Sequence, residues 1–174
     1  MWCQLLHPHV QILLKPVNVP AAAANLSLTF MHNFDFQSKR DGGVLEFSVN
    51  GGAWFDVTSA GSGAAFASGG YNSSLTVTNP SSSRNPLAGR AAWSGTKTGF
   101  SKVAVNLTDA AKFAGKTLQI RWRLATNAST TSPGWYVDDV AIAGVASGNL
   151  PPSITAEAIA TPTPVTAAST QLTV

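Results

Sequence analysis

Apolar residues alternate with polar residues along much of this chain. Between positions 26 and 36 the apolar parity holds Leu26, Leu28, Phe30, His32, Phe34 and Phe36. Successive strand side chains point to opposite faces of a sheet, so this spacing predicts a long strand with one face on a core. The same alternation returns at 45–49, 103–107 and 118–124. No stretch sustains a helical period, apart from one turn predicted at 109–114 with Asp109 as N-cap, so we predict an all-β domain.

Glycine, proline and asparagine mark the expected turns. Residues 50–52 (Asn-Gly-Gly) predict a tight hairpin, because Asn and Gly tolerate positive φ, and 54–57 is the expected returning strand. Residues 59–73 and 79–90 are rich in small, polar and turn-forming residues, so both are predicted to be loops. A short strand is expected at 91–93.

Charged residues are few and scattered. Of 174 residues, 44% are hydrophobic and 11% are charged, and the net charge is +3. Lys39 and Arg40 form the only adjacent basic pair, so we expect no nucleic-acid partner. No apolar run approaches the ~18 residues that span a bilayer, and we expect no membrane span. Cys3 is the single cysteine, so an internal disulfide cannot form.

Composition divides the chain into four expected segments. These are an atypical N-terminal segment at 1–19, a β-sandwich at 20–145, a linker at 146–152 and the truncated start of a second β-domain at 153–174. About twenty residues cannot bury a core of their own, so the last segment is expected to belong to a longer fold. The N-terminus lacks the basic start and cleavage site of a signal peptide. If the module is exported, we expect its signal upstream of this chain.

Two adjacent carboxylates, Asp138 and Asp139, interrupt an otherwise strand-like run at 134–142. Strict alternation would turn one of them toward the core, where a charge needs a partner. One interpretation is structural, with backbone N–H groups or an arginine (Arg90, Arg121 or Arg123) as the partner. The other is calcium binding together with Asp41, Asp35 or Glu46, since calcium takes six to eight oxygen ligands. Both remain open from the residues alone.

Four sequence blocks carry a resemblance to a known family. They are residues 26–32, 41–54 (which opens Asp-Gly-Gly), 85–95 and 134–140, with 118–124 in the expected order between the last two. Over roughly residues 20 to 145 the chain resembles the MAM-like jelly-roll modules beside the catalytic domain of secreted bacterial metallopeptidases, of the immune inhibitor A and fungalysin-associated types. The tail from 151 to 174 resembles the start of an immunoglobulin-like or cadherin-like repeat.

The resemblance implies a non-catalytic accessory module, a spacer, adhesive or stabilising domain of an exported multidomain bacterial protein. Its expected partners are the other domains of the parent protein and an extracellular protein or glycan, and its expected location is extracellular. It also implies a structural calcium held by Asp41, Asp138 and Asp139, with Gln37 and Asn127 where relatives often have acids. Amide oxygens can bind calcium, but the lower negative charge weakens such a site.

Other candidate functions rest on fewer residues. His7 and His9 lack the companions of a zinc site, and His32, on the apolar parity, is expected to be a hydrogen-bonded core residue. Ser94 lacks a nucleophile motif, so we expect no independent catalysis. The rival function is carbohydrate binding on exposed aromatic rings, for which Trp93 and Tyr71 are the candidates. Burial of these rings is the competing expectation.

Overall fold

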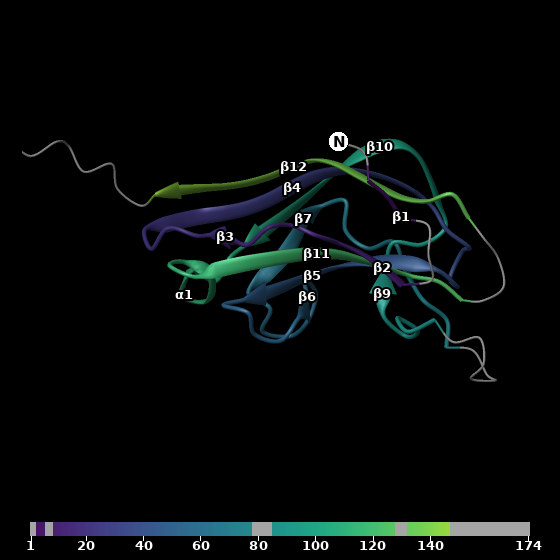
Figure 1. Ribbon diagram of the computed structural model, residues 1–174, viewed down its shortest axis with the longest axis horizontal. Coiled ribbons are helices and arrows are strands. Elements are labelled where there is room, and N and C mark those ends of the chain that lie inside the picture. Colours follow the sequence, from purple (N-terminus) through teal and green to yellow (C-terminus); the bar gives the residue numbers. More distant parts are fainter. Residues whose placement is uncertain (1–2, 6–8, 78–84, 128–131, 147–174) are drawn as a thin grey trace, which may run out of the picture.

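Two antiparallel sheets make up most of the described chain. The computed structural model describes residues 3–5, 9–77, 85–127 and 132–146. In spatial order the first sheet holds β1 (Cys3–Leu5), β12 (Gly134–Ala146), β4 (Ala23–Asp35), β10 (Thr96–Leu107) and β7 (Ala64–Ser68). The second holds β2 (His9–Leu13), β11 (Thr117–Ala125), β5 (Gly42–Val49) and β6 (Phe55–Asp56), and β3 (Val17–Asn18) also pairs with β11. Figure 1 shows β12 and β4 along one side of the molecule and β11 and β5 along the other.

The alternating residues of both sheets meet in one core. β4 buries every second residue from Leu26 onward, as its sequence predicts. These side chains pack with inward residues of β5, β10 and β11, including the fully buried Phe47, Val105 and Trp122. The chain is therefore an all-β protein with a sandwich-like arrangement of antiparallel sheets. The predicted helical turn is also confirmed, as α1 (Ala110–Phe113), with Asp109 as its N-cap.

The Asp-Gly-Gly block lets backbone and ring approach closely at the start of β5. A Cβ on Gly43 would lie 2.6 Å from Cε3 and 2.7 Å from Cη2 of Trp135. A Cβ on Gly42 would lie 2.6 Å from the backbone oxygen of Trp93, which pairs with Gly43 across a β-bridge. Glycine at these positions lets the Trp135 ring lie directly on a neighbouring strand.

A third layer covers the outer face of the second sheet. The small ladder of β8 (Ser73–Ser74) and β9 (Ala91–Ala92) belongs to this layer. Outward residues of β5 and β11 pack with it in a second apolar cluster, made of Val44, Leu75, Leu87, Ala92 and Ala125. As a result β5 is buried on both faces from Gly42 to Ser48, although its sequence predicts a polar outer face.

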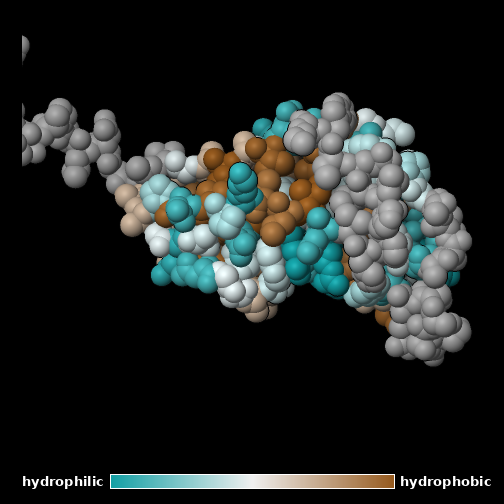
Figure 2. All heavy atoms as spheres, viewed as in Figure 1, coloured by the Kyte–Doolittle hydropathy of each residue, from teal (hydrophilic) through white to brown (hydrophobic). Residues whose placement is uncertain are grey.

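One side of the sandwich is less well covered. Half-buried Ile12, Leu14, Val140 and Ile142 pack against the core near the strands β12 and β2, and Leu13 is 50% exposed. Figure 2 shows apolar surface gathered in the middle of the face that it displays. Among the described residues, no helix is long and apolar enough to cross a membrane.

Several expected boundaries shift in the structure. β7 lies inside the stretch 59–73, so the prediction of a loop there is wrong, because the apolar Phe66 packs on the core beside β10. The hairpin at 50–52 is confirmed, with positive φ at Asn50 and Gly51. β2 and β3 show that the N-terminal segment at 1–19 pairs with β11. The first half of the predicted 79–90 loop, the linker after Ala146 and the segment 153–174 lie outside the described residues.

Candidate functional site

Three of the residues implied by the resemblance, Gln37, Asp41 and Asn127, lie together at the end of the second sheet. Gln37 is the first residue of a turn. Its backbone carbonyl accepts hydrogen bonds from the backbone N–H groups of Arg40 and Asp41, at 3.0 and 2.9 Å. Asn127 follows β11, and its Nδ2 donates to Gln37 Oε1 at 2.9 Å. We call Gln37, Asp41, Asn85, Ser94 and Asn127 the Asp41 cluster. It joins four stretches of chain that are far apart in sequence.

Asp41 is the buried centre of this cluster, with 1% of its surface exposed. Its Oδ1 accepts a hydrogen bond of 2.6 Å from the backbone N–H of Asn127. Its Oδ2 is buried and has no hydrogen-bond partner within the described residues. Burial raises the pKa of the Asp41 carboxyl above its ordinary value, and the bond from Asn127 opposes this rise. A buried carboxylate oxygen without a partner is costly, so Oδ2 is the atom best placed to take a proton or a cation.

Ser94 and Asn85 hold the backbone around Asp41. Ser94 Oγ donates to the Asp41 carbonyl at 2.7 Å and accepts from the backbone N–H of Lys39 at 2.8 Å. Asn85 Nδ2 donates to the carbonyls of Arg40 and Ala125, at 2.8 and 2.6 Å. Both residues are buried, so their hydrogen bonds are well protected from water. Ser94 thus ties the backbone at Lys39 to that at Asp41.

The acidic doublet lies on the other sheet, and the expectation that one of its members faces the core is wrong. The pairing of β12 with β4 skips from Asp138–Met31 to Ala141–Thr29, so β12 holds one extra residue there. Asp139 has φ +49 and is exposed, and Asp138 is half-buried. This β-bulge changes the parity of the strand, so that Val137 and then Val140 face the core. Asp suits the site because it tolerates positive φ better than most residues.

The residues proposed for calcium binding are therefore divided between two places. Gln37, Asp41 and Asn127 belong to the Asp41 cluster, whereas Asp138 and Asp139 form the bulge of β12. Asp139 donates its backbone N–H to Asp138 Oδ1 at 2.9 Å. Within the described ranges, no three His, Cys, Asp or Glu side chains come together as a group that could hold a metal ion.

A network of four charged residues, which the sequence did not predict, lies on the outer face of the second sheet. Glu46 accepts from Arg90 Nη1 at 2.7 Å and from Arg121 Nε at 2.6 Å, and Arg90 Nη2 donates to Asp56 at 2.7 Å. Tyr71 donates its hydroxyl to Asp56 at 2.9 Å. Burial, with help from the Asp56 charge, raises the pKa of Tyr71. The two arginines balance the two carboxylates in charge. The network therefore has no net charge, and it connects β5, β6 and β11 to the covering layer.

A sequence signal for this network does exist. The hairpin at 50–52 places Glu46 opposite Asp56, and β11 places Arg121 opposite Glu46 on its other side. Two like charges that face each other across a ladder are destabilising unless a cation joins them. The proposed arginine partners of the acidic doublet thus include two, Arg90 and Arg121, that bind other carboxylates.

His32 is a core histidine, as its parity predicts. It is 2% exposed, and its Nδ1 accepts from Trp135 Nε1 at 3.4 Å. The rings of Phe30, Phe34 and Trp93 pack edge-on around it. Burial, and then the nearby charge of Lys97, lowers the pKa of His32 to about 4. His7 and the side chain of His9 lie outside the described residues.

This shift predicts that the domain loses stability in mild acid. Between pH 6.5 and about 4 the unfolded chain binds a proton at His32 and the folded protein does not. The stability from neutral His32 is therefore complete above pH 6.5 and is lost as the pH falls to about 4, by on the order of 3 kcal/mol. Urea unfolding at intervals from pH 7.5 to 4 measures this loss. A His32→Phe variant should flatten the curve, and an equally steep curve in that variant would contradict the assignment.

The aromatic residues considered for glycan binding lie inside the domain. Trp93 is 1% exposed, and its Nε1 donates to the carbonyls of Gly69 and Gly70 at 2.9 and 3.0 Å. Tyr71 is half-buried and packs edge-on against Trp93. Trp122 and Trp135 are fully buried. The guanidinium of Arg121 covers the ring of Trp54, with 4.2 Å between Cζ and the ring centroid. Burial under the loops is thus confirmed for Trp93.

The geometry defines an antiparallel all-β domain whose most distinctive buried polar group is Asp41. No protein-family model matches this sequence, and no curated protein matches it.

Proposed function

We propose that this chain is a non-catalytic accessory module of an exported multidomain bacterial protein, with a jelly-roll sandwich as its fold. It spaces or stabilises neighbouring domains outside the cell, and a peptidase is the class of parent protein that we favour. In support of the finer fold, the chain passes from β4 to the second sheet for β5 and β6 and returns to the first for β7 and β10. It then passes to the second sheet for β11 and back to the first for β12. The dense internal bonding of its polar residues favours a rigid scaffold.

Asp41 Oδ2 is the observation that carries the proposal. A buried carboxylate oxygen without a protein partner is completed by a proton or by a bound cation, and the neighbouring oxygen donors favour a cation. The donor set fits a weak calcium site: one carboxylate, with the side-chain amides of Gln37 and Asn127 in the same cluster. A calcium ion bound there would join the turn at 37–41 to the end of β11. One carboxylate corresponds to the weak end of calcium affinities, about 10⁻⁴–10⁻³ M, as in extracellular modules.

Thermal unfolding of chelator-treated protein tests this proposal. Calcium at about ten times its dissociation constant should stabilise the native state by about 1.4 kcal/mol, a rise in Tm of a few degrees. Asp41→Asn should abolish the rise. Asp138→Asn is the matched control and should keep it, because Asp138 lies on the other sheet. An unchanged melt of the wild type, or a full rise in Asp41→Asn, would exclude calcium at this cluster.

A further inference from the structure

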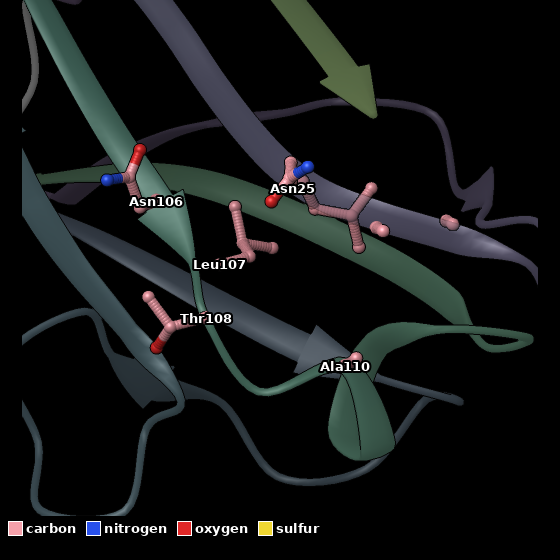
Figure 3. Close-up of a pocket in the computed structure, with 8 residues that line it drawn as sticks. Asn25, Asn106, Leu107, Thr108 and Ala110 are labelled. Atoms are coloured by element: carbon pink, nitrogen blue, oxygen red, sulfur yellow. The ribbon is translucent and has the colours of Figure 1, made fainter. Parts of the chain in front are cut away.

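A groove of about 530 Å³ opens at the end of the sandwich where β4 begins and β10 ends. Its walls come from Ala23, Ala24, Asn25, Leu26, Asn106, Leu107, Thr108 and Ala110. Figure 3 shows Asn25 on β4 and Asn106 on β10, with Leu107 between them. The groove lies apart from the Asp41 cluster and shares no residue with it.

Two departures from regular pairing form this groove. β10 pairs with β4 as far as Leu107–Leu26, and then the chain turns away, with the Thr108 N–H donating to the Gly63 carbonyl at 2.8 Å. β4 continues past this point, and β12, on its other side, is the one described strand that still pairs with it. Asn25 takes φ +54 and inserts one extra residue into β4 relative to β12. Its side chain is exposed as a result. Asn tolerates positive φ better than most residues, so it suits this bulge, where its carboxamide is turned toward solvent.

The polar groups that line the groove have unused hydrogen-bonding capacity. Within the part of the chain that the structure describes, the carboxamides of Asn25 and Asn106 bond to no protein group. Thr108 Oγ1 donates to the Gly63 carbonyl at 3.2 Å and can still accept. Most other described asparagines use their carboxamides internally, namely Asn18, Asn50, Asn72, Asn85 and Asn127. The groove therefore presents free donors and acceptors on both of its strands.

We propose that this groove binds a neutral saccharide. Among the described residues, no charged side chain lines it, which removes the attraction for an ionic ligand. Two carboxamides and a hydroxyl offer paired donors and acceptors of the kind that sugar hydroxyl groups need. The buried Leu26 and Leu107 supply an apolar floor for the C–H face of a sugar ring. An apolar surface with a few convergent polar groups, in a volume of this size, is the usual form of a small-ligand site.

An NMR titration of the ¹⁵N-labelled full chain tests the proposal. Glucose, galactose, mannose and N-acetylglucosamine are the soluble probes, and their β-linked oligosaccharides form a second arm that separates a free sugar from a polysaccharide chain. The protein is produced in bacteria without glycosylation, because Asn25 and Asn106 both lie in Asn-x-Ser/Thr sequons. We expect saturable shifts, with at least one of these sugars, confined to residues 23–26 and 106–110.

The asparagines provide a matched set of variants. Asn106→Ala should weaken binding about fivefold, the loss of one hydrogen bond of about 1 kcal/mol. Asn33→Ala, at a half-buried position in the middle of β4, should leave it unchanged. The dispersion of each spectrum shows whether the variant is folded. The proposal fails if no sugar shifts these resonances at ~100 mM, where a weak site with millimolar Kd is saturated. It fails equally if the shifts map elsewhere or persist unchanged in folded Asn106→Ala.

Discussion

Replacing Gly43 by alanine should destabilise this domain more than any other single methyl group added to its strands, by about 3 kcal/mol or more. The added Cβ would lie within 2.7 Å of the Trp135 ring, a distance that real Cβ atoms do not adopt. Trp135 cannot move away easily, because it is fully buried and packs against His32, Phe36 and Trp93. Urea unfolding measured by tryptophan fluorescence gives the change in free energy directly.

A second substitution separates this steric effect from a general loss of strand propensity. In Gly43→Ala combined with Trp135→Leu the ring is gone, so the alanine should add little to the cost of Trp135→Leu alone. The two changes are in contact and should be strongly non-additive. If their costs simply add, the close approach of Gly43 to Trp135 does not explain why glycine is needed here.

Removal of Glu46 should give the other large effect. The Glu46 side chain is 5% exposed, and its carboxylate joins Arg90 to Arg121. Glu46→Ala leaves two guanidinium groups with Asp56 as the one remaining carboxylate of the network, and breaking a buried ion pair in this way costs about 3–5 kcal/mol. Because Arg90 is partly exposed to water, we expect the loss of stability to be about 3 kcal/mol. Chemical denaturation of the variant measures it.

β11 supplies the control for the network. Arg121 and Arg123 point to the same face of that strand, but Arg121 binds Glu46 whereas no described acid pairs with Arg123. Arg121→Ala should therefore cost clearly more than Arg123→Ala, which should stay within about 0.5 kcal/mol of the wild type, as for ordinary surface substitutions. Equal effects of the two would mean that the network does not stabilise the fold.

Sequence periodicity predicted the strands well because each depends on local alternation. Leu26 to Phe36 and Leu118 to Leu124 face the core as expected. Alternation failed at Asp138 and Asp139, since a bulge adds a residue and reverses the parity of the strand beyond it. A bulge is fixed by the partner strand, which periodicity within one strand does not reveal.

The candidate site was predictable only in part. The resemblance named Gln37, Asp41 and Asn127, and the structure brings these three together. It could not show that Asp138 and Asp139 lie on a different sheet, because that depends on how β12 pairs. The burial of Glu46 was also missed, since it depends on Arg90 and on the covering layer that includes Leu75, Leu87 and Ala92, all distant from Glu46 in sequence. The position of the acidic doublet and the burial of Glu46 both depend on contacts between residues distant in sequence, which a local pattern does not reveal.

The most direct measurement is an NMR titration of the Asp41 side-chain carboxyl, with and without calcium. Without calcium, we expect a pKa above the ordinary aspartate value, since burial opposes ionisation. Saturating calcium should lower that pKa, because the ion binds only the ionised carboxylate. An ordinary aspartate pKa that does not change when calcium is added would contradict the assignment of Asp41 as a buried calcium ligand.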